Sequence, residues 1–175
     1  MGFVFQNIHL MPALTALENV SVASDIKGHG SSSEEELLRF VGMEGHARKR
    51  PSELSGGERQ RVGIARALAG DPGIILADEP TAALDTENAY DVMDLLRKLA
   101  TRAGRAVVVV THDVRLFGYA DRILELECGM TREAGSHEEN FEPVVLCSDD
   151  DGNLLFGGEG GEDSLVCVGE DRAGR

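Results

Sequence analysis

The sequence predicts an α/β fold built on a mostly parallel sheet. Two short, continuous apolar runs, residues 73–77 and 106–110, alternate along the chain with segments of helical periodicity. Such runs are typical of parallel strands that are covered on both faces, so we expect both to be buried on both sides. Polar residues follow each run directly, at the end of a strand where open α/β sheets bind their ligands. A chain of 175 residues is long enough for one domain with a real core.

Composition limits the classes of function. The formal net charge is −14, and residues 131–175 alone hold 12 acids and 3 bases. This acidity argues against nucleic acid as a partner. The sequence has no apolar run long enough to span a membrane and no basic region followed by an apolar core at its start. Its three cysteines are widely spaced, as expected of reduced thiols in a cytoplasmic protein.

The first 45 residues predict one strand and two helices. Residues 2–5 have the composition of a short buried strand, and Gln6 follows it. Thr15 and Glu18 have the spacing of a capping box at the start of a helix. A Gly/Ser linker follows, and Ser33 then caps a second helix. We expect one face of this second helix to carry Leu37, Phe40 and Val41.

A serine and two glycines open the next predicted helix. Ser55 is a good N-cap, and Gly56 and Gly57 would form the first turn, where a foreign group can approach the backbone closely. The first N–H groups of a helix lack internal partners and the helix dipole makes that end positive, so this is a ready phosphate site. On pattern alone, a glycine-rich turn before an ordinary helix is equally acceptable. The inward positions of the helix would be Val62, Ile64, Ala65, Leu68 and Ala69.

Two adjacent acids follow the apolar run 73–77. Asp78 and Glu79 would lie at the carboxyl end of that strand. Adjacent carboxylates suit a division of labour, in which one holds Mg²⁺ through water and the other polarises an attacking water. The structural alternative is a pair of surface acids before a turn at Pro80.

The remaining elements follow in order. Asp85 or Thr86 would cap a helix, and the strand 106–110 delivers Thr111 and His112. A lone histidine after a strand is usually structural. Asp113 would cap a short helix to about residue 119, before a last strand at 123–127. The inward face of the helix after Asp85 would carry Ala89, Val92, Met93, Leu96, Leu99 and Ala100.

Taken together, these motifs resemble those of ATP-binding-cassette (ABC) ATPases. The octapeptide Leu54–Arg61 is similar to the family's signature motif. Four further positions match the family's order: the Q-loop, the Walker B strand with its catalytic glutamate, the D-loop and the switch histidine. Here these are Gln6, residues 74–80 with Glu79, residues 83–85 and His112.

The resemblance covers about residues 2–130 and implies a partial P-loop NTPase, an ABC nucleotide-binding domain with a helical subdomain. On this basis residues 10–70 are the helical subdomain, and residues 1–9 and 71–130 are the remainder of the catalytic core. Residues 131–175 are expected to be an acidic, Gly-rich tail, either disordered or a marginal hairpin. The wording of residues 3–6 and 10–15 resembles the branch that serves macrolide efflux, lipoprotein release and related glycolipid export.

The resemblance also implies roles for individual residues, with ATP and Mg²⁺ as ligands. In the family two subunits pair head to tail, and the signature of one closes over ATP held by the other. Glu79 would be the general base, and Asp78 would hold Mg²⁺, which the Q-loop glutamine also reaches. The ATP-closing residues would be Ser55, Gly56, Gly57 and Glu58, and the groups that align the γ-phosphate and water would be His112 and Gln6.

One part of the family pattern is missing from these residues. No Gly-x-x-x-x-Gly-Lys-Ser/Thr sequence, the phosphate-binding Walker A loop, occurs in the 175 residues, which therefore have the form of an N-terminally truncated subunit. In the family, the strand before that loop lies between the strand of the switch histidine and the last strand. We therefore expect unpaired edges at 106–110 and 123–127, low stability of the chain alone, and no independent ATP hydrolysis.

Two functions remain open. The first is a fragment of an ABC transporter ATPase subunit that couples ATP hydrolysis to export, peripheral on the cytoplasmic face of the membrane. Its partners would be a transmembrane permease subunit and another ATPase subunit, identical or different. The second is a catalytically inactive subunit that binds and regulates a transmembrane protein or an intact ATPase. A DNA-repair ATPase of related cassette type fits the wording of residues 60–61 and 80–85 less well.

Overall fold

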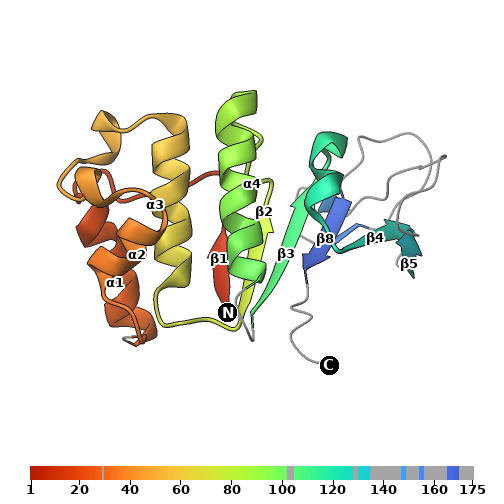
Figure 1. Cartoon of the computed structure of the whole chain (residues 1–175), viewed down its shortest axis with the longest axis horizontal. Coiled ribbons are helices and arrows are strands. Elements are labelled where there is room, and N and C mark those ends of the chain that lie inside the picture. Colours follow the sequence, from red (N-terminus) through yellow and green to blue (C-terminus); the bar gives the residue numbers. More distant parts are fainter. Residues whose placement is uncertain are drawn as a thin grey trace.

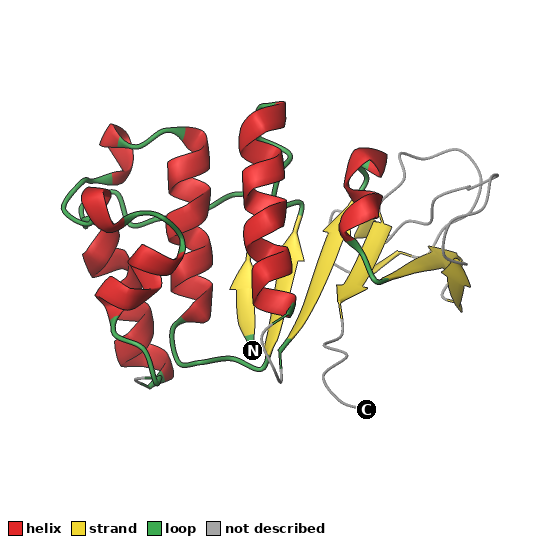
Figure 2. Ribbon diagram, in the orientation of Figure 1, coloured by secondary structure: helices red, strands yellow, loops and turns green. Residues whose placement is uncertain are grey.

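The structure, a computed structural model, describes residues 1–28, 30–101, 105–127, 130–134, 147–148, 154–155 and 165–169. In this part of the chain, a six-stranded sheet has helices over one face and beside its first strand (Figure 1; Figure 2). This is the α/β architecture that the sequence predicts. The order across the sheet is β1 (Gly2–Val4), β2 (Ile74–Asp78), β3 (Ala106–Thr111), β8 (Leu165–Gly169), β4 (Arg122–Glu127) and β5 (Met130–Ala134).

Three of the four α-helices in the described part of the chain precede β2. α1 (Ala16–Lys27), α2 (Glu34–Phe40) and α3 (Gly56–Leu68) lie side by side next to β1 (Figure 1). The 3₁₀ turns η1 (Glu44–His46) and η2 (Pro51–Glu53) lie between α2 and α3. Each of these three α-helices begins at a capping box, in which a serine or threonine side chain accepts from the third helical N–H and the glutamate there accepts in return. The predicted caps are confirmed: Thr15 with Glu18, Ser33 with Glu36, and Ser55 with Glu58.

The fourth helix, α4 (Thr86–Ala100), lies over the sheet (Figure 1). Asp85, and not Thr86, is its N-cap: its carboxylate accepts from the N–H of Asn88 at 3.0 Å. The predicted inward face is confirmed and also includes Leu95. Residues of this face of α4 form one continuous core with residues of α3 and of one face of the sheet. The predicted inward positions of α3 are all buried: Val62, Ile64, Ala65, Leu68 and Ala69.

The sheet is not buried as the sequence led us to expect. β1, β2 and β3 run parallel, and burial alternates along each of them. Val4, Ile75 and Val109 face the helices and are buried, whereas Phe3 and Ile74 on the opposite face are exposed by 46% and 41%. The expectation that residues 73–77 and 106–110 are covered on both faces is therefore wrong for the described residues, because α4 lies over only one face of the sheet (Figure 2).

The largest departure from expectation is in the middle of the sheet. β8 lies between β3 and β4 and pairs antiparallel with both. Leu165 is opposite Thr111, and Cys167 is opposite both Val109 and Ile123. The expected unpaired edges on β3 and β4 are therefore wrong, because a strand from the acidic C-terminal region fills the position between them.

The rest of the C-terminal region adds three short strands. β5 extends the sheet beyond β4 as an antiparallel neighbour. β6 (Cys147–Ser148) and β7 (Leu154–Leu155) pair with each other in a separate two-stranded hairpin. Asp113 caps η3 (Val114–Tyr119), a 3₁₀ helix where a short helix was predicted. Within the described ranges, no helix is long and apolar enough to cross a membrane.

Candidate functional site

The predicted carboxylate and histidine meet at the edge where β2 and β3 end. The two strands are in parallel register, with Asp78 opposite Val110, so the residues after them emerge side by side. The N–H of Glu79 donates to the carbonyl of Val110 at 2.9 Å. Glu79 has a φ of +42°, a left-handed conformation that few residues other than glycine adopt. The backbone thus turns sharply at Glu79 and directs its side chain towards β3.

The carboxylate of Glu79 has three partners from the end of β3. Oε1 lies 2.7 Å from Nδ1 of His112 and accepts from the N–H of His112 at 3.1 Å. Oε2 accepts from the hydroxyl of Thr111 at 3.3 Å. A carboxylate only accepts, so the proton of this short contact is on Nδ1. In neutral His112, Nε2 then keeps its lone pair.

Exposure differs sharply between the two partners. The side chain of Glu79 is 12% exposed, whereas that of His112 is 61% exposed. Glu79 is therefore held from behind, and His112 presents its outer nitrogen to solvent. This arrangement fixes the orientation of the Glu79 carboxylate. It also places the His112 ring where a ligand bound at this edge of the sheet could contact it.

Gln6 and Asp78 are placed less tightly. Both are exposed, Asp78 at the last position of β2 and Gln6 two residues after β1. β1 and β2 are parallel neighbours, so the two residues follow strands that end at the same edge. No hydrogen bond or ion pair links either residue to Glu79 or His112 within the described part of the chain. No group of three or more His, Cys, Asp or Glu side chains that could hold a metal ion occurs in this part either.

The predicted signature residues, Ser55–Glu58, form the start of α3. The hydroxyl of Ser55 accepts from the N–H of Glu58 at 3.2 Å, and the carboxylate of Glu58 accepts from the N–H of Ser55 at 2.7 Å. This second bond is the main cause that holds the pKa of Glu58 below its usual range. His46 from η1 contributes to the lowering, with Nε2 at 3.1 Å from the same carboxylate. The bonds of Glu58 to Ser55 and His46 thus hold the first turn of α3 in place.

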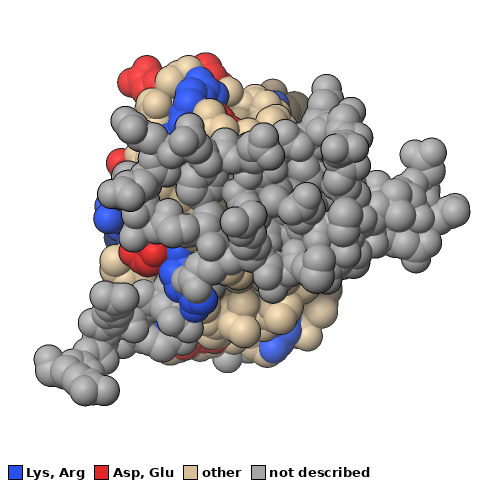
Figure 3. Space-filling model, turned by 90° about the vertical axis from the view of Figure 1, so that its right-hand side faces the viewer, with Lys and Arg blue, Asp and Glu red and all other residues tan. Residues whose placement is uncertain are grey.

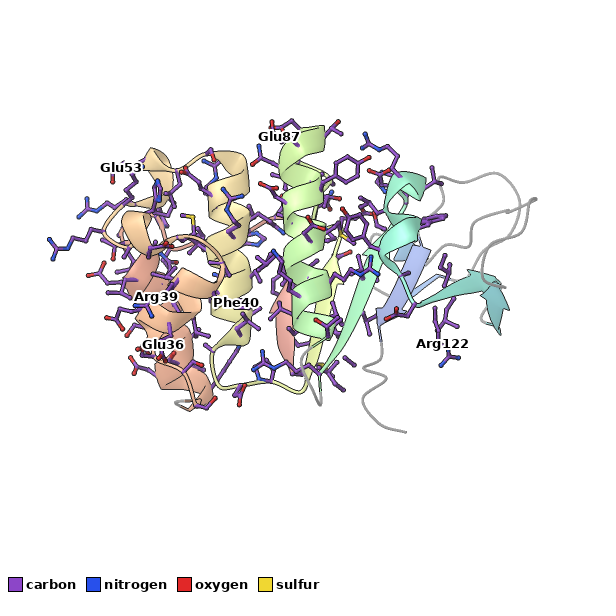
Figure 4. The ribbon with its side chains drawn as sticks, in the orientation of Figure 1. Glu36, Arg39, Phe40, Glu53, Glu87 and Arg122 are labelled. Atoms are coloured by element: carbon purple, nitrogen blue, oxygen red, sulfur yellow. The ribbon has the colours of Figure 1, made fainter. Side chains whose placement is uncertain are left out.

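The start of α3 lies at the same end of the molecule as the start of α4. Glu53, just before α3, and Glu87, in the first turn of α4, mark that end, and the strands β2 and β3 point towards it (Figure 4; Figure 1). A Cβ added at Gly56 would be 3.6 Å from the side chain of Leu84 and 3.8 Å from the carbonyl of Ala83. The signature turn therefore packs against residues 83–84 of its own chain.

Three residues of this region make contacts that the sequence did not predict. The hydroxyl of Thr111 bonds Glu79, and His46 pairs with Glu58. Asn88 packs against Gly57, and its position as the third residue after the cap Asp85 was the only local sign of a role. The other contacts depend on which strands and turns become neighbours.

Comparison with known proteins shows to which family the chain belongs. The family model described as "ABC transporter" matches residues 1–82. An ABC transporter ATP-binding protein of Methanocaldococcus jannaschii, itself uncharacterized, is 47% identical over 74% of the chain and 58% of its own length. The chain belongs to the ABC transporter ATP-binding family. A lipoprotein-releasing system ATP-binding protein, LolD of Anaeromyxobacter dehalogenans, is also 47% identical, over 80% of the chain and 61% of its own length.

Relatives with permease segments and solved structures extend the comparison. A macrolide export ATP-binding/permease protein, MacB of Mannheimia succiniciproducens, is 46% identical over 73% of the chain and 20% of its own length. A solved dimeric ATP-binding cassette, in a post-hydrolysis state with ADP and Pi, matches with 43% identity and a TM-score of 0.65. That match covers 78% of this chain and 63% of the other. The chain thus spans about three fifths of the length of the single-cassette relatives it matches.

Proposed function

We propose that this chain is part of an ATPase subunit that couples ATP binding and hydrolysis to export across a membrane. The observation that carries the proposal is the carboxylate of Glu79, held by Thr111 and His112 at the carboxyl edge of β2 and β3. A carboxylate oriented in this way, beside a solvent-facing imidazole, suits a general base acting on a water molecule. Membership of the ABC transporter ATP-binding family indicates that the ligand is ATP.

Each side chain at the edge has a role in the proposal. Glu79 accepts a proton from the attacking water, and the Thr111 hydroxyl and the His112 N–H keep its carboxylate in place. With protons on both ring nitrogens, His112 would donate its outer N–H to a γ-phosphate oxygen. Gln6 orients the water, and with Asp78 it holds Mg²⁺, which would neutralise charge on the phosphate oxygens. Asp78 and Gln6 fit this role because both are exposed at the end of their strands.

The signature residues have a different role. Ser55, Gly56 and Glu58 lie at the start of α3, where the helix dipole favours an anion. We propose that Ser55–Glu58 close over the phosphates of ATP held by a second ATPase subunit. The Walker A loop that holds each nucleotide would come from residues other than these 175. This is the signature half of a composite ATP site.

The proposal includes a place and partners. The dimeric solved cassette supports pairing with an ATPase subunit, identical or different, and the ATP-binding/permease relatives support a transmembrane permease as the other partner. The chain would then lie on the cytoplasmic face of the membrane. On the face seen in Figure 3, some described Lys and Arg side chains lie close to described Asp and Glu side chains.

The test is the substitution Glu79→Gln in the intact subunit assembled with its partners. We expect kcat for ATP hydrolysis to fall by about 10²–10⁴-fold, the usual contribution of a general base, because the amide cannot accept the proton. Binding of ATP should persist, since Gln keeps the shape of the side chain. Steady-state phosphate release and nucleotide binding measure the two effects separately.

A matched control is Glu35→Gln, the same chemical change on the exposed surface of α2. It should leave turnover unchanged. If Glu79→Gln turns over ATP as fast as this control, Glu79 is not the base and the proposed function loses its main support.

One observation favours a second candidate, a catalytically inactive subunit that regulates an intact ATPase or a transmembrane protein. β8 completes the sheet between β3 and β4, so these residues already form a continuous sheet without a further strand. The discriminating experiment adds this chain to an intact ATPase partner. A regulatory subunit changes the partner's rate even with Glu79→Gln in this chain, whereas a catalytic one requires Glu79.

A further inference from the structure

Gly57, the second glycine of the signature, is packed against another part of its own chain. It is buried, and a Cβ added there would come within 2.9 Å of Cγ and 3.2 Å of Cβ of Asn88 on α4. Real side chains do not approach so closely without displacement. The neighbour of this glycine is therefore the amide side chain of Asn88.

Asn88 cannot easily move away, because it is held at both ends. Its N–H donates to Oδ1 of Asp85 at 3.0 Å, and its Nδ2 donates to Oδ2 of the same carboxylate at 2.7 Å. These two bonds are also the largest causes that keep the pKa of Asp85 below its usual range. The cap of α4 thus fixes the side chain that packs on the first turn of α3.

The backbone of α3 does not itself require glycine at this position. Gly57 lies in regular helix with no positive φ, unlike Gly28, Gly42 and Gly70. Its neighbour Gly56 has room: the nearest atoms to an added Cβ there are 3.6 Å and 3.8 Å away, ordinary contact distances. The two glycines therefore differ in the space beside them: an added Cβ fits at Gly56 and does not fit at Gly57.

We infer that Asn88 is a positioning residue for the signature turn, and that Gly57 is a glycine because Asn88 packs on it. The Asp85–Asn88 pair ties the start of α4 to the start of α3, so the two helix ends keep a fixed separation. In the proposed function, which this inference deepens, the N–H groups of α3 reach the phosphates of ATP on a second subunit. Their position relative to residues 83–85 would then be set by Asn88.

The first experiment is a double-substitution cycle in urea unfolding of this chain, and it does not depend on the proposed function. Gly57→Ala should raise the equilibrium constant for unfolding by roughly tenfold, because the new methyl group displaces Asn88. Asn88→Ala removes the amide and leaves only the Cβ at 3.2 Å, so Gly57→Ala should raise the constant clearly less in that background than in the native chain. Gly56→Ala is the matched control and should change the constant least, because the nearest neighbours of its added Cβ lie at ordinary contact distances.

The second experiment measures ATP turnover of the assembled enzyme. Asn88→Ala alone should raise KM for ATP by severalfold with a smaller change in kcat, because the signature turn is less well placed while Glu79 is untouched. Gly57→Ala alone should lower activity further. The double variant should return to the level of Asn88→Ala alone, which a loss of stability elsewhere would not produce.

Two results would overturn the inference. If Gly57→Ala costs the same stability with and without Asn88, then Asn88 does not determine the glycine. If the cycle shows coupling but the double variant stays as inactive as Gly57→Ala, ATP itself requires the glycine. A failed proposed function looks different: the stability cycle still shows coupling, and Glu79→Gln leaves turnover unchanged.

Discussion

The helices and the sheet of this protein are specified over very different distances along the chain. Each α-helix that the structure describes begins at a side-chain cap whose two partners are three residues apart. The middle of the sheet instead joins β3 to β8, with Thr111 opposite Leu165. The helix starts are thus fixed by neighbours in sequence, and the sheet is completed by a segment from the far end of the described chain.

This difference teaches where local physical chemistry is enough. A capping box uses two residues and one turn of backbone, so its parts are visible in any short stretch of sequence. A strand in the middle of a sheet needs two neighbouring strands, and its own five residues do not determine which strands these are. The comparison can be tested by disturbing each kind of contact in turn.

The largest effect is expected from Val168→Pro in β8. Val168 is opposite Val108 on one side and Arg122 on the other, and proline removes an N–H and clashes within a central strand. We expect the free energy of unfolding to fall by about 3 kcal/mol or more, and aggregation to rise as β3 and β4 become edges. Urea unfolding and light scattering measure the two.

Val168→Ala is the control for this change, because it shortens the side chain and keeps the N–H. A Val168→Pro variant that unfolds at the same urea concentration as Val168→Ala would mean that β8 does not hold the sheet together.

An intermediate effect is expected from removing a cap. Ser55→Ala should lower the free energy of unfolding by about 1 kcal/mol, because the N–H of Glu58 loses its acceptor. Ser33→Ala, at the start of α2, should cost a similar amount for the same reason. Ser32→Ala, at the exposed residue before that cap, is the control, and equal urea midpoints for Ser32→Ala and Ser55→Ala would contradict the role of the cap.

The smallest effect is expected from the charge of Glu58. Its pKa is lowered in the folded state, so its ionised form stabilises the fold above about pH 4.5, and this contribution is lost as the pH falls through the folded-state pKa. Glu58→Gln keeps the capping acceptor and should cost only a few tenths of a kcal/mol at pH 7. The difference from the native chain should shrink below pH 4.5 in urea titrations, and a difference that grows there would refute the assignment.

The predictability of the fold follows the same division. The caps at Thr15, Ser33 and Ser55 and the inward face of α4 could be predicted, because periodicity and capping are local. The exposed face of β1 to β3 could not, since apolar runs look alike whether one face or both are covered. The place of β8 was missed because its five residues lie in an acidic, Gly-rich region that suggested no partner.

The candidate site divides in the same way. Glu79 and His112 could be identified, because each follows a strand and matches a family motif, and the structure brings them within 2.7 Å. That distance itself depends on the register of β2 against β3, which the sequence does not state. The contact of Asn88 with Gly57 depends on how α4 packs against α3, and no local pattern encodes it.

The position of β8 also has a consequence for the order in which the protein can form during synthesis. Residues 16–100, with all four α-helices, leave the ribosome well before residues 165–169. The helical layer can therefore pack while β3 and β4 still lack the strand between them. Because β8 must then enter between two strands already in place, its insertion is a late, long-range step that is expected to be slow. Mature protein and nascent chain would differ most at the centre of the sheet, where only β3 lies between β8 and the strand that leads to Glu79.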